Sequence, residues 1–294
     1  MRKLLLINKH NQVLDLLNNR NRFIMTACEG LHGVETEIPE SETAYTDGAI
    51  IKEENVKALP RGIELTFTLR GNVKDSIDYF TSIVKSKQLV TLREIEGNRD
   101  ITIQGIATIP PYSRMMQTCK IVLTIYCGQP YWEDLNNMVE VISNIINLLH
   151  FPTEGQYFTV DGRPFGAIQT DLTKTFENKS DTTVGLIINL IALGEVKKPR
   201  IVCGSGSQVG WYMQLNLTLQ PNDELVISTV KTKKYITING LETYNGEPIL
   251  NYLEWQGNDW LQLETGKNTF SVTTEDGETN ANLYFNIIYK GRYE

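Results

Sequence analysis

Alternation of apolar and polar residues is the pattern that most limits what this chain can fold into. In residues 61–70, the apolar side chains Ile63, Leu65, Phe67 and Leu69 are each separated by one polar residue. A period of two places the apolar side chains on one face of an extended strand, as in a half-buried antiparallel sheet. The same alternation recurs in four more segments: residues 100–107, 120–127, 213–219 and 283–289.

Turn-forming residues separate these segments. Asn239-Gly240 and Asp276-Gly277 suit type I′ hairpin turns, because both dipeptides tolerate positive φ. Pro221-Asn222-Asp223 is typical of a plain turn before the apolar residues 225–227. Many short strands at this spacing predict a mainly β chain built as a sandwich or barrel. The length of 294 residues is enough for two such domains.

Two segments have helical rather than alternating spacing. Residues 75–87 carry Ile77, Phe80, Ile83 and Val84 at helical intervals. A longer apolar stripe predicts a helix over residues 133–150, with Asp134 as its cap and Pro152 at its end. Its members are Leu135, Met138, Val139, Ile142, Ile145, Ile146 and Leu149. We therefore expect a first domain over 1–132, an amphipathic helix and linker over 133–177, and a β-sandwich over 178–294.

The charge and the scarcity of reactive residues exclude several functions. Lys and Arg total 28 against 35 Asp and Glu, a net charge of −7, which argues against specific nucleic-acid binding. Three His and four Cys are a small stock of metal ligands and catalytic bases. No hydrolase, zinc-protease or nucleotide-binding motif occurs. We predict a protein that is not an enzyme and has no catalytic residues, no metal and no cofactor.

Some short motifs resemble phosphate-binding or catalytic sites, but the residues around them favour a structural interpretation. Gly204-Ser205-Gly206 is interpreted as a β-turn, since no Lys and no helix follow it as in a phosphate loop. Glu94 with Glu96, and the group Glu275, Asp276 and Glu278, are interpreted as solvated turn charges rather than glycosidase carboxylates. The four cysteines, Cys28, Cys119, Cys127 and Cys203, are expected to be reduced and mostly buried.

The N-terminus and the hydropathy pattern bear on localisation. The apolar run in residues 4–7 is too short for a signal peptide, so a first β-strand is predicted there. No apolar stretch approaches ~18 residues, so no transmembrane helix and no membrane insertion are expected. These observations predict a protein made in the cytoplasm.

Aromatic residues gather in the second half of the chain: Trp211, Tyr212, Tyr252, Trp255 and Trp260. On a β-sandwich, exposed Trp and Tyr rings can stack on the apolar faces of sugars. The other interpretation, which is favoured, is that these rings fill the core between two sheets. The sequence leaves carbohydrate binding by Trp211, Tyr212, Trp255 and Trp260 as an open alternative.

Several landmarks occur in order along nearly the whole chain. They are residues 99–105, the strand 119–132 with its Pro130-Tyr131-Trp132 end, 178–181, 187–193, 199–201, 219–229, 258–268 and 287–293. Together they resemble the phage distal tail proteins, also called Dit or siphophage tail components. Departures from the family pattern at Ser180 and Lys198 leave the tail type, flexible or contractile, unassigned.

The resemblance implies a structural protein at the distal end of a phage or phage-like tail. The first domain, a β-barrel-like unit with a helix, would form a hexameric ring that continues the tail tube and lets DNA pass. The second would be a galectin-like or carbohydrate-module-like β-sandwich, and the last strand would pack on the first domain. The implied partners are the tail tube protein, a tail-tip or baseplate protein and a cell-wall glycan. The sequence does not assign the ring interface.

Overall fold

The structure is a computed structural model. It describes residues 2–18, 22–39, 41–42, 49–50, 56–69, 71–111, 120–142, 145–147, 166–168, 173–257, 260–274 and 283–294. The predicted turn at Asp276-Gly277, the helix end at Pro152, the acidic group 275–278 and Cys119 lie outside these residues.

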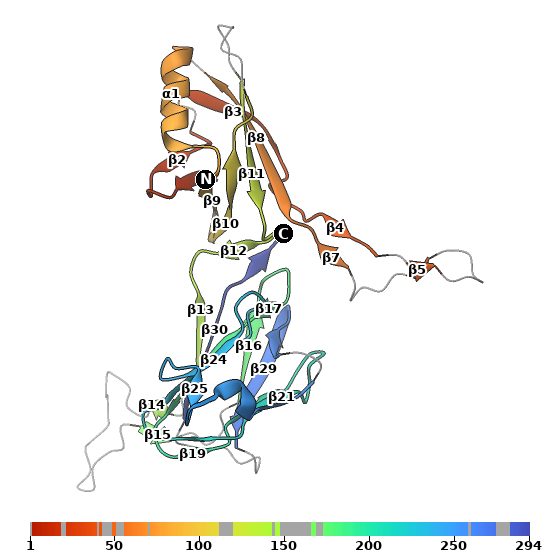
Figure 1. Cartoon of the computed structure of the whole chain (residues 1–294), viewed down its shortest axis with the longest axis vertical. Coiled ribbons are helices and arrows are strands. Elements are labelled where there is room, and N and C mark those ends of the chain that lie inside the picture. Colours follow the sequence, from red (N-terminus) through yellow and green to blue (C-terminus); the bar gives the residue numbers. More distant parts are fainter. Residues whose placement is uncertain are drawn as a thin grey trace, which may run out of the picture. The chain divides into compact units, whose positions relative to one another are not determined.

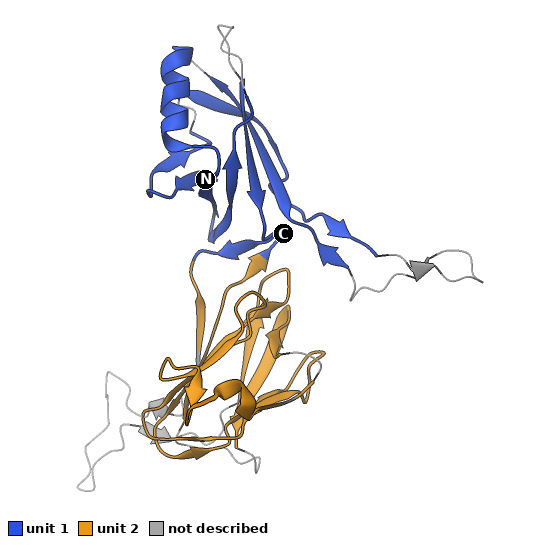
Figure 2. Cartoon of the chain, in the orientation of Figure 1, with its two compact units in different colours: residues 1–135, 293–294 blue, residues 136–292 orange. Residues whose placement is uncertain are grey.

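The prediction of a mainly β chain is confirmed. The chain forms two compact units, residues 1–135 with 293–294, and residues 136–292 (Figure 2). Each unit has its own core of buried apolar side chains. In the described part of the chain, no helix has the length and hydropathy needed to span a bilayer.

The first unit is built on a nine-stranded sheet, in which the neighbouring strands from β2 to β3 are antiparallel. The order is β2-β1-β9-β10-β11-β8-β3, with β12 added beside β10 and β31 beside β12 (Figure 1). The strands are β1 (Lys3–Asn8), β2 (Val13–Asp15), β3 (Phe23–Glu29), β8 (Arg61–Leu69), β9 (Gln88–Glu96), β10 (Arg99–Thr108), β11 (Lys120–Cys127), β12 (Trp132–Asp134) and β31 (Arg292–Tyr293). The alternation of β8 is confirmed, since Ile63, Leu65 and Phe67 are fully buried.

The predicted helix at residues 75–87 is confirmed, but it begins two residues earlier and ends four residues earlier. Helix α1 spans Val73–Ile83 and starts at Asn72, whose side chain accepts a hydrogen bond from the Lys74 backbone N–H at 3.1 Å. Its buried Phe80 ring packs against Phe67 and Phe23, with centroids 5.2 and 5.5 Å away. The apolar stripe of α1 therefore covers the inner face of the sheet.

Two short ladders form an arm on the first unit. Strands β4 (Thr36–Glu37) and β7 (Lys57–Ala58) pair with each other, as do β5 (Ser41–Glu42) and β6 (Ala49–Ile50). Figure 1 shows β4 and β7 leaving the body of the unit between β3 and β8.

The second unit is a β-sandwich. One sheet has the order β13-β30-β18-β23-β24 and the other β16-β29-β20-β21-β27. The first contains β13 (Met138–Ile142), β30 (Leu283–Tyr289), β18 (Ile187–Ala192), β23 (Glu224–Ser228) and β24 (Tyr235–Ile238). The second contains β16 (Thr173–Asn178), β29 (Gly266–Thr273), β20 (Arg200–Cys203), β21 (Tyr212–Leu215) and β27 (Leu253–Gln256). Both sheets contribute to a single core, as Phe285 and Phe270 illustrate.

Short elements complete this unit. They are the paired strands β14 (Ile145–Asn147) and β15 (Gly166–Ile168), β17 (Val184–Gly185) and β28 (Gln262–Leu263), β19 (Val196–Lys197) and β22 (Thr218–Leu219), β25 (Thr243–Tyr244) and β26 (Glu247–Pro248), and the 3₁₀ helix η2 (Ile249–Tyr252).

The predicted helix over 133–150 is wrong. Among its described residues, 133–134 lie in β12, 138–142 in β13 and 145–147 in β14, and 135–137 connect the first two strands. β13 pairs along its whole length with β30, from Met138 opposite Tyr289 to Ile142 opposite Phe285. The apolar residues of this segment fit helical spacing, but Val and Ile have low helix propensity and pack well in a sheet. Pairing with β30 therefore favours a strand over a helix.

Two turns in the second unit, at Asn239-Gly240 and at residues 215–217, end strands β24 and β21. Asn239 and Gly240 have φ of 52° and 78°, and Ile238 and Leu241 exchange two hydrogen bonds of 2.9 Å, so the predicted two-residue hairpin is confirmed. The single strand predicted over 213–219 is wrong. The Leu217 N–H donates to the Leu215 carbonyl at 2.8 Å, and this tight turn separates β21 from β22.

Candidate functional site

Two of the predicted aromatic residues, Tyr212 and Trp255, lie on the last two strands at one edge of the second sheet of the sandwich. β21 carries Tyr212 and follows directly on Trp211, and it pairs with β27, where Trp255 stands opposite Met213. β27 is the last strand in the order of that sheet. The structure therefore brings Tyr212 and Trp255 onto neighbouring strands although they are far apart in sequence.

The rings of Trp211 and Trp260 are partly buried and pack against the core. Gly257 lies against the Trp211 ring, since a Cβ at Gly257 would lie 2.5 Å from two of its ring carbons. Lys234 Nζ is 5.4 Å from the centroid of the Trp260 ring, a cation–π distance. These two rings therefore combine the predicted core role with partial exposure.

Tyr212 is part of a polar row on the outer face of β20, β21 and β27. The Arg200 guanidinium lies 4.2 Å from the centroid of its ring, and its hydroxyl donates to Glu254 Oε1 at 3.2 Å. Asn216 Nδ2 donates to the other oxygen of Glu254 at 3.1 Å. These two hydrogen bonds, that of Asn216 first, hold the pKa of Glu254 below its ordinary value. An aromatic ring beside amide and carboxylate groups suits a hydroxyl-rich ligand.

Gly204-Ser205-Gly206 leads into a turn, in which the Val209 N–H donates to the Gly206 carbonyl at 3.3 Å. The Glu264 carboxylate accepts from the Ser207 backbone N–H at 3.1 Å and from the Ser207 hydroxyl. The Ser205 hydroxyl accepts from the Thr269 N–H at 2.7 Å. A carboxylate of the chain itself thus fills the place that a bound anion would take.

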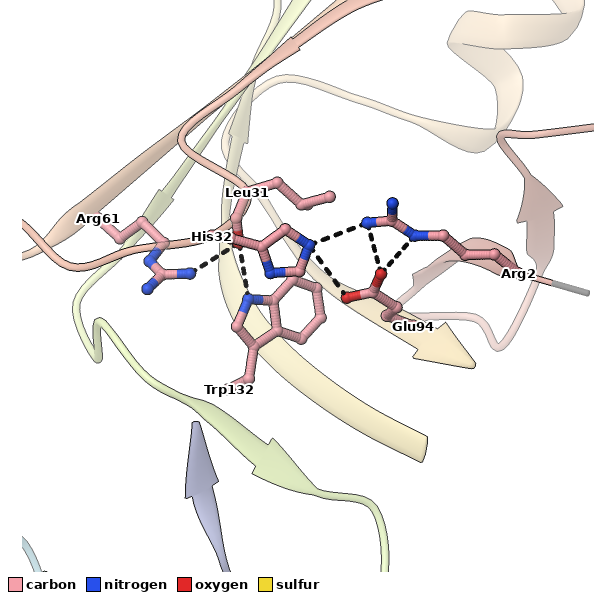
Figure 3. A network of polar contacts seen from close by, with 6 residues as sticks. All are labelled: Arg2, Leu31, His32, Arg61, Glu94 and Trp132. Atoms are coloured by element: carbon pink, nitrogen blue, oxygen red, sulfur yellow. Dashed lines mark hydrogen bonds and ion pairs between the residues drawn. The ribbon is translucent and has the colours of Figure 1, made fainter. Parts of the chain in front are cut away.

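A buried polar network in the first unit was not predicted from the sequence (Figure 3). The Leu31 carbonyl accepts hydrogen bonds from Arg61 Nη1 at 2.8 Å and from Trp132 Nε1 at 2.9 Å. Arg61 is 5% exposed and Trp132 is fully buried, and burial lowers the pKa of Arg61. The network ties the segment that leads into the arm to β8 and β12.

Glu96 is exposed, but Glu94 is buried, so the interpretation as a solvated charge is wrong for Glu94. Its side chain is 3% exposed and accepts from Arg2 Nε at 2.6 Å. His32 Nε2 lies 2.9 Å from Arg2 Nη2 and 3.6 Å from Glu94 Oε2, and the His32 ring stacks on Trp132. The alternation of β9 places Glu94 on the inner face, where the positive charge of Arg2 compensates its burial.

Within the described residues, no group of three or more His, Cys, Asp and Glu side chains is placed to hold a metal ion. Cys127 and Cys203 are buried, Cys28 is half-buried, and all three are free thiols.

We expect the Cys127 thiol to react with iodoacetamide only after unfolding. Burial raises its pKa to about 11 from an ordinary value of 9.0, so the reactive thiolate at pH 8 is roughly a hundredfold rarer in the folded chain. Mass spectrometry of alkylated peptides, with and without urea, measures this. Labelling of Cys127 in the native chain as fast as in urea would contradict the expectation.

A family comparison defines the class to which the second unit is similar. Residues 181–293 match the model of the siphovirus-type tail component, C-terminal domain. The match confirms the resemblance inferred from the ordered landmarks and supports a structural role in a phage tail.

The fold of the whole chain is similar to that of a particular solved protein. This is SPP1 Dit (gp 19.1), described as a paradigm of the hub adsorption apparatus in phages that infect Gram-positive bacteria. The identity is 13%, the TM-score is 0.63, and all of both chains is covered. The phage P2 baseplate in its activated conformation with Ca gives 10% identity and a TM-score of 0.44, covering 100% of this chain and 98% of that one. No curated protein matches the chain.

Proposed function

We propose that this chain is a non-enzymatic structural protein at the distal end of a phage tail. Six copies would form a ring that joins the tail tube to the tail-tip or baseplate protein. The observation that carries the proposal is the match of residues 181–293 to siphovirus-type tail components. The fold shared with SPP1 Dit over the whole length supports extending the role to the first unit.

The first unit carries a candidate contact surface for the ring. Leu89, Ile106 and Tyr126 stand side by side on β9, β10 and β11, because Ile106 is opposite both Leu89 and Tyr126 in the sheet register. They are 50%, 43% and 58% exposed. An apolar row across three strands favours a protein contact, and a second copy of the chain is the partner that ring closure requires.

The charge supports a role in DNA passage. The net charge of −7 leaves little attraction for phosphate, so DNA would slide through the ring without being retained. A ring whose inner surface proved basic would contradict this part of the proposal.

The experiment that tests the ring is negative-stain microscopy of the purified chain with light scattering. The expected result is a six-fold ring, formed by the chain alone or after addition of tube and tip proteins. A monomer under all of these conditions would refute the proposal.

The polar row around Tyr212 favours a second candidate function, carbohydrate binding by the sandwich. The contributing residues would be Trp211, Tyr212, Trp255 and Trp260. The specific observation is that Trp211, Tyr212 and Trp260 each keep part of their surface exposed. A host cell-wall glycan would be the ligand.

We expect Tyr212→Ala to weaken glycan binding by about tenfold, because it removes a ring worth roughly 1 kcal/mol or more in stacking and hydrogen bonding. Tyr212→Phe keeps the ring and removes only the hydroxyl that Glu254 accepts from, so it is the matched control. Pull-down with purified cell walls and a glycan array measure both variants. Absence of wild-type binding to any host polysaccharide would exclude this function.

A further inference from the structure

A cavity of about 280 Å³ lies in the first unit, where the turn between β1 and β2 meets the segment between α1 and β9. Lys9 and His10 line it from the turn, and Lys85, Lys87 and Gln88 line it from the other segment. Among its described lining residues there is no Asp or Glu. Lys9, Lys85 and Lys87 give the lining of this cavity a positive charge, which attracts an anion.

One buried side chain holds the two walls together. Asn8 is 4% exposed, and its amide nitrogen donates to the carbonyl of Ile83, at the end of α1, at 2.8 Å. Its amide oxygen accepts from the backbone N–H groups of His10 and Gln12 at 2.9 and 3.0 Å. The wall that carries Lys9 and His10 is therefore fixed to the end of the helix before any ligand binds, which reduces the entropy cost of binding.

The second wall is also constrained. The Lys85 N–H donates to Gln88 Oε1 at 3.3 Å, and Gln88 is 8% exposed. Gln88 also lines the cavity, so this buried side chain contributes an amide to the lining. Lys87 has φ of 64°, a conformation that Gly or Asn adopts at lower cost. Lys therefore occupies a position at which the backbone conformation by itself favours Gly or Asn.

We propose that this cavity binds a phosphate group, free or as a monoester. The size is sufficient, since a water molecule occupies about 30 Å³ and the cavity could hold several. A phosphate near neutral pH carries close to two negative charges and three or more acceptor oxygens, which match several ammonium donors and the Gln88 amide. A carboxylate, with one charge and two oxygens, uses fewer of these donors.

Isothermal titration calorimetry of the full chain tests the site, with inorganic phosphate and glycerol 3-phosphate as probes and acetate as the comparison anion. We expect saturable binding of one phosphate per chain and much weaker binding of acetate. Tighter binding of glycerol 3-phosphate assigns the site to a phosphate ester, and equal or weaker binding assigns it to free phosphate. Both results support the proposal.

The variants are Lys87→Asn, which suits the left-handed backbone, and Lys85→Gln. Each should raise the dissociation constant about tenfold, because each removes one of the three lysine charges of the lining. The matched control is Lys74→Gln, an exposed lysine near the start of α1 and about 14 Å of helix from the cavity. It removes the same charge and should change the dissociation constant less than about twofold. Circular dichroism confirms that each variant is folded.

Three results would overturn the proposal: no saturable phosphate binding, acetate binding as tight as phosphate, or equal weakening by Lys74→Gln and Lys87→Asn. A DNA duplex that binds better than phosphate and loses affinity equally in all three variants would also overturn it, because that pattern indicates nonspecific attraction to surface charge.

Discussion

Replacement of Phe80 by Ala is expected to lower the free energy of unfolding of the first unit by about 3–5 kcal/mol. Phe80 is fully buried and joins helix α1 to the sheet through the rings of Phe23 and Phe67. Removing its ring eliminates two aromatic contacts and leaves a cavity that the flanking strands cannot close.

Hydrogen exchange with mass spectrometry measures this loss locally, on peptides from β8 and β11. The control is Tyr79→Ala on the same helix. Tyr79 is 40% exposed and lies 5.7 Å from the Arg22 guanidinium, so the expected loss is under about 1 kcal/mol. Equal losses in the two variants would show that the inner face of α1 does not hold the unit together.

Replacement of Ile106 by Glu is expected to prevent ring assembly without unfolding the chain. Ile106 is the centre of the row with Leu89 and Tyr126. A carboxylate there is exposed in the free chain but would lose water in an apolar contact, and ring closure repeats this cost at every interface. Light scattering should report a fall from the mass of the ring to that of the monomer.

Gln104→Glu is the matched control for the assembly variant. Gln104 is exposed two residues earlier on the same face of β10, and the substitution adds the same charge. It should assemble as the wild type does. If Ile106→Glu also assembles normally, the row is not the interface, whereas a wild type that never assembles refutes the ring itself.

The strands and the first helix could be predicted because their signal is local. In β8, β10, β11 and β30, period-two alternation is visible in the sequence and matches one buried and one outer face. In α1, the spacing of Ile77, Phe80 and Ile83 is enough. These patterns predict directly which side chains are buried on the same face of an element.

The segment after Trp132 could not be predicted, because its apolar residues satisfy both periods. Val139 and Ile142 lie on one face of a helix, yet the structure places them in β13 beside β30, more than a hundred residues later. Glu94 was missed for a related reason. A charged side chain is expected to be exposed to solvent, and only the fold places Arg2 within hydrogen-bond distance of Glu94.

The functional residues divide in the same way. The ordered landmarks in the sequence were enough to indicate a tail component, and the family match supports that inference. The polar row around Tyr212, the exposed row around Ile106 and the lysines of the cavity were not visible, since each joins residues from separate elements.

The sequence by itself determined the β class, the hairpin at Asn239-Gly240 and the absence of known catalytic motifs, because alternation, turn chemistry and motif spacing act over a few residues. The tertiary structure determined that residues 138–142 form a strand, that Glu94 is buried, and that Lys9, Lys85 and Lys87 line one cavity. These outcomes depend on which distant segments pair and pack, and such contacts carry no signal in the local order of residues.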